Sequence, residues 1–249
     1  MLARSLRRKK AGFPVLIHAG GDQHNMPVDR SRSGLVGGMN RNYHIVKRLM
    51  DLFICLTAAP FLLGIGIVLA IAIRIDSPGP VFFFQKRVGK GSRLFSLIKF
   101  RTMHKDINDL AHREFMQAYV NGRVQETRSP DGTFKPFQED QLTSLGRFLR
   151  KTSLDELPQL INVVKGEMSL VGPRPNVCWE VQAYQPWHLK RLDVLPGITG
   201  LAQIRGRSRI TFDEIVRHDL EYINKRCLLL DLKILWWTAA QVGLGRGAE

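Results

Sequence analysis

Two adjacent carboxylates, Asp155 and Glu156, are the residues of this 249-residue chain best suited to do chemistry. They follow Arg150 and Lys151, and they stand where the apolar spacing predicts the start of a helix, an end that attracts phosphate. A carboxylate pair can hold Mg²⁺ beside a diphosphate, and one carboxylate can attack phosphorus directly. This combination suits phosphoryl transfer, which depends on positioning and charge stabilisation.

A structural explanation of the same residues stays open. Ser153 and Glu156 have the spacing of a capping box, in which both side chains bond backbone N–H groups at a helix start. Alternatively, Asp155 is itself the cap, and Pro158 then falls in the first turn, where its missing N–H costs no bond. Such patterns are common, so this tetrapeptide alone does not establish a catalytic role.

Basic residues on expected turns are further candidates for binding phosphate. An arginine on a rigid turn can hold phosphate through two hydrogen bonds. Each one alone is more often a solvated surface charge, but their number on one chain indicates a phosphorylated ligand. The candidates are Arg87, Lys99, Arg101, Arg174 and Arg207.

The charge balance narrows the choice of partner. The chain has 37 Lys and Arg against 22 Asp and Glu, for a net charge of +15. This excess implies an anionic partner, which could be nucleic acid, an acidic membrane or a phosphorylated substrate. The three cysteines and seven histidines lack the spacing of a disulfide framework or a zinc site.

An uncharged apolar run over residues 52–73 indicates a membrane segment. As a straight helix it would be roughly 33 Å long, about the thickness of the hydrocarbon core. Pro60 inside the run predicts a kink. Both flanks are basic, and basic flanks favour the cytoplasmic side, as expected for a bent helix that enters and leaves by one face. The residues alone leave a straight span and a re-entrant helix open.

The expected fold is mostly α with a small β-hairpin. The hairpin is predicted over residues 81–85 and 94–100, and turn-rich loops over 121–140, 171–175 and 196–200. Three parts are expected: a basic flexible tail (1–40), a membrane helix hairpin kinked at Pro60 (41–76), and a compact cytosolic catalytic domain with membrane-interface helices (77–249). Helices are predicted over 104–119, 142–150, 154–165, 178–192, 212–226 and 229–242.

Short motifs follow one another from about Lys47 to Trp237, and together they resemble one family. They are Lys47-Arg48-x-x-Asp51, Ser77-Pro-Gly-Pro-Val-Phe82, Gln85-x-Arg87-x-Gly89, Lys99-Phe-Arg-Thr-Met103, Ser153-Leu-Asp-Glu-Leu-Pro-Gln-Leu160, the run from Asn162 to Pro175, and Pro196-Gly-Ile-Thr-Gly-Leu-Ala-Gln203. The chain resembles the bacterial sugar transferases, or monotopic phosphoglycosyl transferases, in the short form that acts as a polyprenyl-phosphate hexose-1-phosphate transferase.

The resemblance implies a two-step reaction with Mg²⁺ as cofactor. An aspartate of the family attacks the β-phosphate of a UDP-sugar, UMP leaves, and undecaprenyl phosphate then takes the phosphosugar from the aspartate. This is the first membrane step of exopolysaccharide or O-antigen-type glycan synthesis. It implies a place at the bacterial inner membrane, with the catalytic domain on the cytoplasmic face, among membrane lipids and without nucleic acid. The sugar, the pathway and a homodimer stay open.

Carried onto this chain, the resemblance makes Asp155 the nucleophile and a Mg²⁺ contact. Glu156 would assist with Mg²⁺ or with protons, and Arg150 matches a phosphate-binding arginine. The other expected contacts with substrate are Lys99, Arg87, Arg101, Arg174, Gln203 and Arg207.

The resemblance also implies that the membrane helix is re-entrant, although the chain departs from the family at the kink. Some members have Ser-Pro there, and this chain has Ala59-Pro60. A serine hydroxyl can bond back to the preceding turn and help a helix to bend. Its absence leaves the bend to Pro60 and to the glycines that follow it.

A different class of function remains as the alternative: a non-enzymatic basic membrane anchor that recruits an anionic partner. An anchor needs the positive charge but not Asp155, whereas the enzyme needs Asp155. A nucleic-acid-binding protein would account for the basic composition but not for the apolar run.

Overall fold

The structure is a computed structural model that describes residues 41–104, 110–123, 141–206 and 209–243. The expected tail (1–40), most of the expected loop over 121–140, and Arg207 lie outside these residues. The described part is mostly helical with a small antiparallel hairpin, as predicted.

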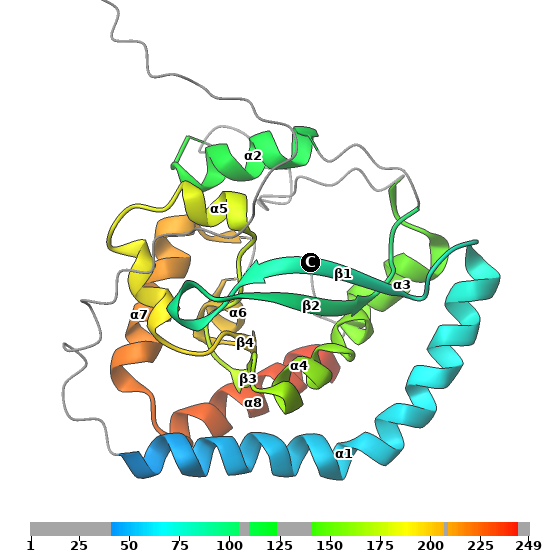
Figure 1. Cartoon of the computed structure of the whole chain (residues 1–249), viewed down its shortest axis with the longest axis horizontal. Coiled ribbons are helices and arrows are strands. Elements are labelled where there is room, and N and C mark those ends of the chain that lie inside the picture. The colour runs from blue at the N-terminus through cyan, green and yellow to red at the C-terminus, as the bar shows by residue number, and fades with distance from the viewer. Residues whose placement is uncertain (1–40, 105–109, 124–140, 207–208, 244–249) are drawn as a thin grey trace, which may run out of the picture.

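The first element, α1 (Arg41–Asp76), is a 36-residue helix that contains Pro60. Figure 1 shows it lying along the base of the molecule and then bending to rise along one side. Proline removes a backbone donor and crowds the preceding turn, which accounts for a bend. Within the described residues, α1 is the one helix with the length and apolar character needed to cross a bilayer.

The N-terminal limb of α1 is fixed to the rest of the fold by polar side chains. Lys47 Nζ lies 3.1 Å from Asp231 Oδ2. Arg48 Nη1 donates to the carbonyl of Val163 at 2.6 Å, at the end of the helix α4 (Gln159–Lys165). Asp51 is buried and accepts from Ser169 Oγ at 2.6 Å. These bonds hold the limb against three separate elements.

The C-terminal limb is fixed mainly by apolar packing. Leu69 and Ile73 are buried in one cluster with Phe100 and Leu149. Arg101 closes the junction just past the helix, because its Nη2 donates to the backbone oxygen of Ser77 at 2.6 Å. Both limbs therefore pack against one folded unit.

The predicted hairpin is confirmed and is longer than expected in its first strand. β1 (Phe82–Val88) pairs antiparallel with β2 (Leu94–Phe100). The strands are joined by a tight turn over Lys90–Ser92, in which Gly91 has a φ of 62°. Residues directly opposite share a face of the hairpin, so Phe83 and Lys99 point to the same side.

A second pair of strands was not predicted. β3 (Ser169–Val171) pairs parallel with β4 (Gly197–Thr199). β4 lies within the segment 196–200, which was expected to be a loop, so that prediction is wrong. The strands are only three residues long, and glycines stand at their ends (Gly172, Gly197 and Gly200), which hides them from a search for apolar alternation. The glycines are needed, because a Cβ on Gly197 would collide with the backbone of Gly172.

Most predicted helices are present with shifted bounds. Residues 178–192 are a correction: α5 (Cys178–Gln182) ends early and a 3₁₀ turn (His188–Asp193) follows, with Pro186 between them. Residues 105–109 of the expected first helix of the domain lie outside the described part. The remaining helices are α2 (Leu110–Val120), α3 (Ser144–Thr152), α6 (Leu201–Arg205), α7 (Phe212–Lys225) and α8 (Leu228–Gly243).

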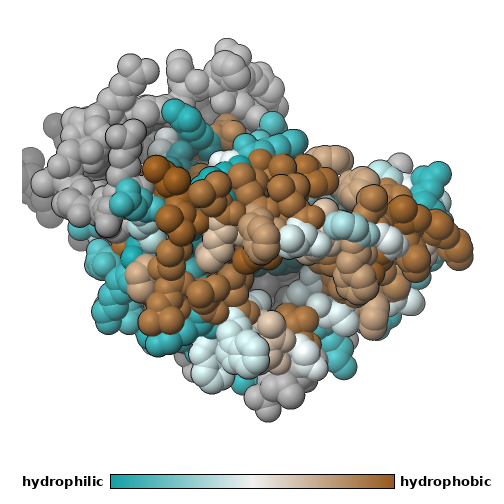
Figure 2. Space-filling model, turned by 90° about the horizontal axis from the view of Figure 1, so that it is seen from below, coloured by the Kyte–Doolittle hydropathy of each residue, from teal (hydrophilic) through white to brown (hydrophobic). Residues whose placement is uncertain are grey.

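Much of the surface of α1 is apolar. Figure 2 looks at the molecule from below and shows apolar residues over much of this face. The helix exposes Leu56, Phe61, Leu63, Ile67 and Val68 around its bend. On α8, Leu229, Leu232, Trp236 and Trp237 are exposed as well. Apolar surface of this extent indicates association with a membrane.

Candidate active site

Asp155 and Glu156 stand in a short 3₁₀ turn (Leu154–Glu156) that joins α3 to α4. The chain reverses at Ser153, which has a φ of 57° and ends α3. Leu154 and Leu157 pack into the cluster that holds the C-terminal limb of α1. The turn is therefore anchored by its leucines while its two carboxylates face the other way.

Neither capping interpretation is correct. Ser153 makes no side-chain cap of the turn, and in the described residues α4 begins after Pro158 without a side-chain cap. The left-handed backbone at Ser153 takes that residue out of the geometry of a helix N-cap, which is extended. Helix capping thus does not explain this acidic pair.

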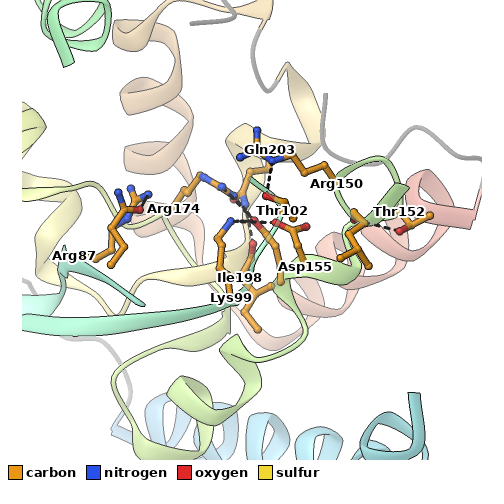
Figure 3. A network of polar contacts seen from close by, with 12 residues as sticks. Arg87, Lys99, Thr102, Arg150, Thr152, Asp155, Arg174, Ile198 and Gln203 are labelled. Carbon is orange, nitrogen blue, oxygen red and sulfur yellow. Dashed lines mark hydrogen bonds and ion pairs between the residues drawn. The ribbon is translucent and has the colours of Figure 1, made fainter. Parts of the chain in front are cut away.

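Lys99 reaches both carboxylates from β2. Its Nζ lies 2.8 Å from Glu156 Oε1 and 3.7 Å from Asp155 Oδ2. Figure 3 shows Lys99 and Arg174 directed toward the centre of the site from different elements. Lys99 of the hairpin is thus brought together with the two residues of the turn, of which Glu156 stands 57 positions later in the chain.

Arg174 approaches the same carboxylate from the loop that follows β3. Both of its terminal nitrogens lie 3.1 Å from Glu156 Oε1. The Arg174 side chain remains 49% exposed, whereas that of Glu156 is 12% exposed. The guanidinium group therefore has one side on the carboxylate and another open to a ligand.

Asp155 is buried but poorly satisfied. It is 5% exposed, and its Oδ1 has no hydrogen-bond partner among the described residues. Burial raises the pKa of Asp155 above its usual range, against the opposing charge of Lys99. An unpaired buried acceptor costs about 1–3 kcal/mol, so this oxygen is suited to a ligand that the fold itself does not provide.

Glu156 has the opposite electrostatic character. Burial works against its ionised form, but Lys99 and Arg174 outweigh that effect and lower the pKa of Glu156 to about 2. The two neighbouring carboxylates therefore differ, with Glu156 firmly ionised and Asp155 closer to titration. Divergent pKa values in one pair are typical of sites with separate chemical roles.

Arg150 lies beside this pair, and its charge interacts with both Asp155 and Glu156. Its Nε donates to Thr102 Oγ1 at 3.1 Å, and its charge favours the ionised form of Asp155. Burial lowers the pKa of Arg150 from its ordinary value. Thr102 was not singled out from the sequence, although it stands in the motif Lys99-Phe-Arg-Thr-Met103.

The other predicted contacts lie at different places. Arg87 donates to the carbonyl of Pro175 at 3.0 Å and lies to one side of the carboxylates (Figure 3). Arg101 is buried against the end of α1. Gln203 donates to the carbonyl of Ile198 at 2.8 Å. Arg207 lies outside the described residues. A substrate-binding role for these four stays a prediction.

The carboxylate oxygens at the centre of the site provide only part of the ligands that a Mg²⁺ ion needs. In the described ranges no group of three or more His, Cys, Asp or Glu gathers as a complete metal site. Asp155 and Glu156 alone would supply two carboxylates, and Asp155 Oδ1 is without a partner. Mg²⁺ is often held by one or two carboxylates together with substrate phosphates, so this pair fits such a shared site.

The sequence corresponds to a known family. The family model described as bacterial sugar transferase matches residues 42–245. The chain therefore belongs to the bacterial sugar transferase family.

Similar proteins include three bacterial relatives. The chain is 40% identical over 206 residues to "Galactosyl transferase CpsE" of Streptococcus agalactiae, covering 82% of this chain and 44% of the relative. It is 37% identical over 240 residues to "UDP-glucose:undecaprenyl-phosphate glucose-1-phosphate transferase" of Xanthomonas campestris, covering 92% and 45%. It is 40% identical over 209 residues to "Uncharacterized sugar transferase EpsL" of Bacillus subtilis, covering 82% and 91%. The chain thus spans less than half of the first two relatives.

Proposed function

We propose that this protein transfers a sugar-1-phosphate from a UDP-sugar to undecaprenyl phosphate, in the synthesis of a bacterial polysaccharide. The observation that carries the proposal is the arrangement at Asp155. An under-bonded buried carboxylate stands beside an ionised one, and Lys99 and Arg174 contact the pair. Cations of this kind stabilise the charge of a diphosphate, and a carboxylate is an effective nucleophile toward phosphorus.

The proposed reaction has two displacements at the β-phosphorus. In the first, an Asp155 carboxylate oxygen bonds to phosphorus, the bond to the UMP oxygen breaks, and UMP leaves with the electron pair. In the second, a phosphate oxygen of undecaprenyl phosphate attacks the same phosphorus. The bond to Asp155 breaks, which regenerates the carboxylate and yields the undecaprenyl diphosphate sugar.

The surrounding side chains bind and orient the substrate in this scheme. Arg174 would hold the diphosphate on its exposed side. Lys99 would keep Asp155 ionised and balance the charge that develops on the leaving phosphate. Asp155 and Glu156 would hold Mg²⁺, which when bound neutralises phosphate charge. Glu156, with its low pKa, stays charged throughout.

We also propose that α1 is re-entrant and that the catalytic domain lies on the cytoplasmic face. In support, the N-terminal limb of α1 bonds to β3, α4 and α8, and its C-terminal limb packs against β2 and α3. A helix that crossed the bilayer would separate its ends by about 30 Å, with one on each side of the membrane. Two ends fixed to one domain are instead expected on the same side.

Topology is testable with single cysteines at both ends of α1. In a cysteine-free background, Asn42→Cys and Asp76→Cys should each react with an impermeant maleimide in inside-out membrane vesicles and not in intact spheroplasts. Labelling of one position only in spheroplasts and of the other only in inside-out vesicles would show that α1 crosses the bilayer.

The function is tested by measuring UMP release from a panel of UDP-sugars with purified protein, Mg²⁺ and undecaprenyl phosphate. Release with one sugar supports the transferase and identifies the donor. Because the names of the relatives include both galactosyl and glucose transfer, the panel must contain both. If no sugar yields UMP, the basic membrane anchor becomes the better explanation.

A further inference from the structure

Arg174 stands in a short loop, residues 173–176, whose backbone carbonyls are all bonded. The two outer carbonyls accept from backbone groups of other elements. Gly197 N donates to the oxygen of Pro173 at 2.9 Å, and Val88 N donates to that of Asn176 at 2.9 Å. The loop has two prolines and no regular structure of its own, so its shape depends on these partners.

The two inner carbonyls accept from arginine side chains. Arg191 Nη2 donates to the backbone oxygen of Arg174 itself at 3.2 Å. Arg87 Nη1 donates to the backbone oxygen of Pro175 at 3.0 Å. Both guanidinium groups therefore bond the backbone at and next to the residue whose side chain contacts Glu156.

Arg191 is itself held rigidly. It is 3% exposed, and its Nη2 lies 2.6 Å from Asp219 Oδ2 on α7. Its Nη1 donates to Asn176 Oδ1 at 2.7 Å and to Tyr184 Oη at 2.8 Å. One planar group thus connects a long helix to the loop by several bonds at once, which an ammonium group cannot reproduce.

We propose that Arg191, assisted by Arg87, is a positioning residue that sets where the Arg174 guanidinium meets the donor diphosphate. The proposal rests on the proposed function, since Arg174 acts on the diphosphate only in that scheme. It gives Arg87 a role in the loop rather than the substrate contact expected from the sequence. A small displacement of a group that binds the transferring phosphate is expected to cost up to about 10²-fold in rate.

A double-mutant cycle tests whether Arg191 acts through Arg174. Arg191→Lys keeps a positive charge for Asp219 but loses the planar guanidinium group with its two terminal nitrogens. We expect kcat/KM for the UDP-sugar to fall about 10- to 100-fold. Arg174→Ala is expected to cost about 10²-fold or more. The double variant should lose no more than Arg174→Ala alone. Losses that multiply would overturn the proposal, because Arg191 would then act independently of Arg174.

Hydrogen exchange provides a readout that does not depend on activity. In Arg191→Lys, the amides of Val88 and Gly197, which donate to the loop, should exchange faster than in the wild type. Arg205→Lys is the matched control, because it makes the same Arg-to-Lys change in another ion pair with α7, that of Arg205 with Glu221, which is partly exposed. Unchanged exchange in Arg191→Lys would overturn the proposal even in a protein that releases no UMP.

Arg87→Lys repeats both tests from the hairpin side if Arg191→Lys does not fold. It removes the bond to the Pro175 carbonyl and leaves the Arg191–Asp219 pair in place. Faster exchange at Val88 together with a non-additive loss with Arg174→Ala is the expected result. Normal exchange and an additive loss would contradict the proposal. A wild type that releases no UMP would contradict the proposed function, while the exchange data would still decide what holds the loop.

Discussion

Two buried aspartates of this protein, Asp155 and Asp231, have opposite surroundings. Asp231 on α8 is 0% exposed and accepts from Tyr43 Oη at 2.9 Å and from Tyr222 Oη at 2.7 Å, with Lys47 Nζ at 3.1 Å. Asp155 is 5% exposed, and its Oδ1 has no hydrogen-bond partner within the described part of the chain.

The difference separates a carboxylate that holds the fold from one that is available to a ligand. Asp231 is fully bonded, and its partners include two residues of α1, so it joins the membrane helix to the domain. Asp155 has the Lys99 ammonium at 3.7 Å and keeps an oxygen without a partner. Burial and charge alone do not distinguish the two; the completeness of their hydrogen bonding does.

Breaking the contacts of Asp231 should give the largest effect on stability. Asp231→Asn leaves the Lys47 ammonium without its partner in a mostly buried position, and the loss is expected to be about 3–5 kcal/mol. Thermal unfolding in detergent should show a fall in Tm of at least several degrees. Lys47→Met combined with Asp231→Leu should recover much of that loss. An unchanged Tm in Asp231→Asn would refute the anchoring role.

Removing Lys99, the cation that contacts Asp155 and Glu156, should instead affect activity. Lys99→Met is expected to lower kcat for UMP release about 10²- to 10³-fold, because a preorganised charge at the reacting group is lost. Lys86→Met is the matched control, since Lys86 is an exposed lysine on the face of the hairpin opposite to that of Lys99. Equal activity of the two variants would contradict a role for Lys99 in the reaction.

The pH dependence should follow Asp155. Because burial raises its pKa, the reactive ionised form is lost as pH falls through a value above the ~4 of an ordinary aspartate. Below that value kcat/KM should fall about tenfold per pH unit. Glu156 does not titrate there, because its pKa is about 2. In rate profiles, an acid limb at or below pH ~4 would contradict the assignment.

The same substitution should have opposite effects on stability at the two aspartates. A raised pKa means that the folded state favours the neutral form of Asp155, so the ionised form destabilises the fold at neutral pH. Asp155→Asn should therefore leave Tm unchanged or raise it slightly, whereas Asp231→Asn lowers it. A clear loss of Tm in Asp155→Asn would mean that Asp155 is structural.

The sequence predicted the parts of this protein that carry local patterns. The apolar run, the hairpin and the helices that became α7 and α8 follow from residue periodicity. The acidic pair and the basic residues Lys99 and Arg174 were found as separate motifs, and the structure brings these four together.

What the sequence missed depends on distant contacts. Each strand of the parallel pair β3–β4 is only three residues long, which is too short to show an alternating pattern. Arg191 and Asp219 look like ordinary surface charges in a helical sequence, yet both are buried. The capping interpretation of Ser153 failed because that residue ends α3 in a left-handed backbone conformation, with its N–H donating to the carbonyls of Leu149 and Arg150.

The central claim, that Asp155 is the nucleophile, is tested most directly by trapping the phosphosugar on the enzyme. Wild-type protein is mixed with Mg²⁺ and a UDP-sugar labelled in the sugar, without undecaprenyl phosphate, and then quenched in acid and digested. We predict a burst of UMP equal to the enzyme present, with the label on the peptide that contains Asp155 and none in Asp155→Asn. Label on another peptide, or equal label in Asp155→Asn, would contradict the account.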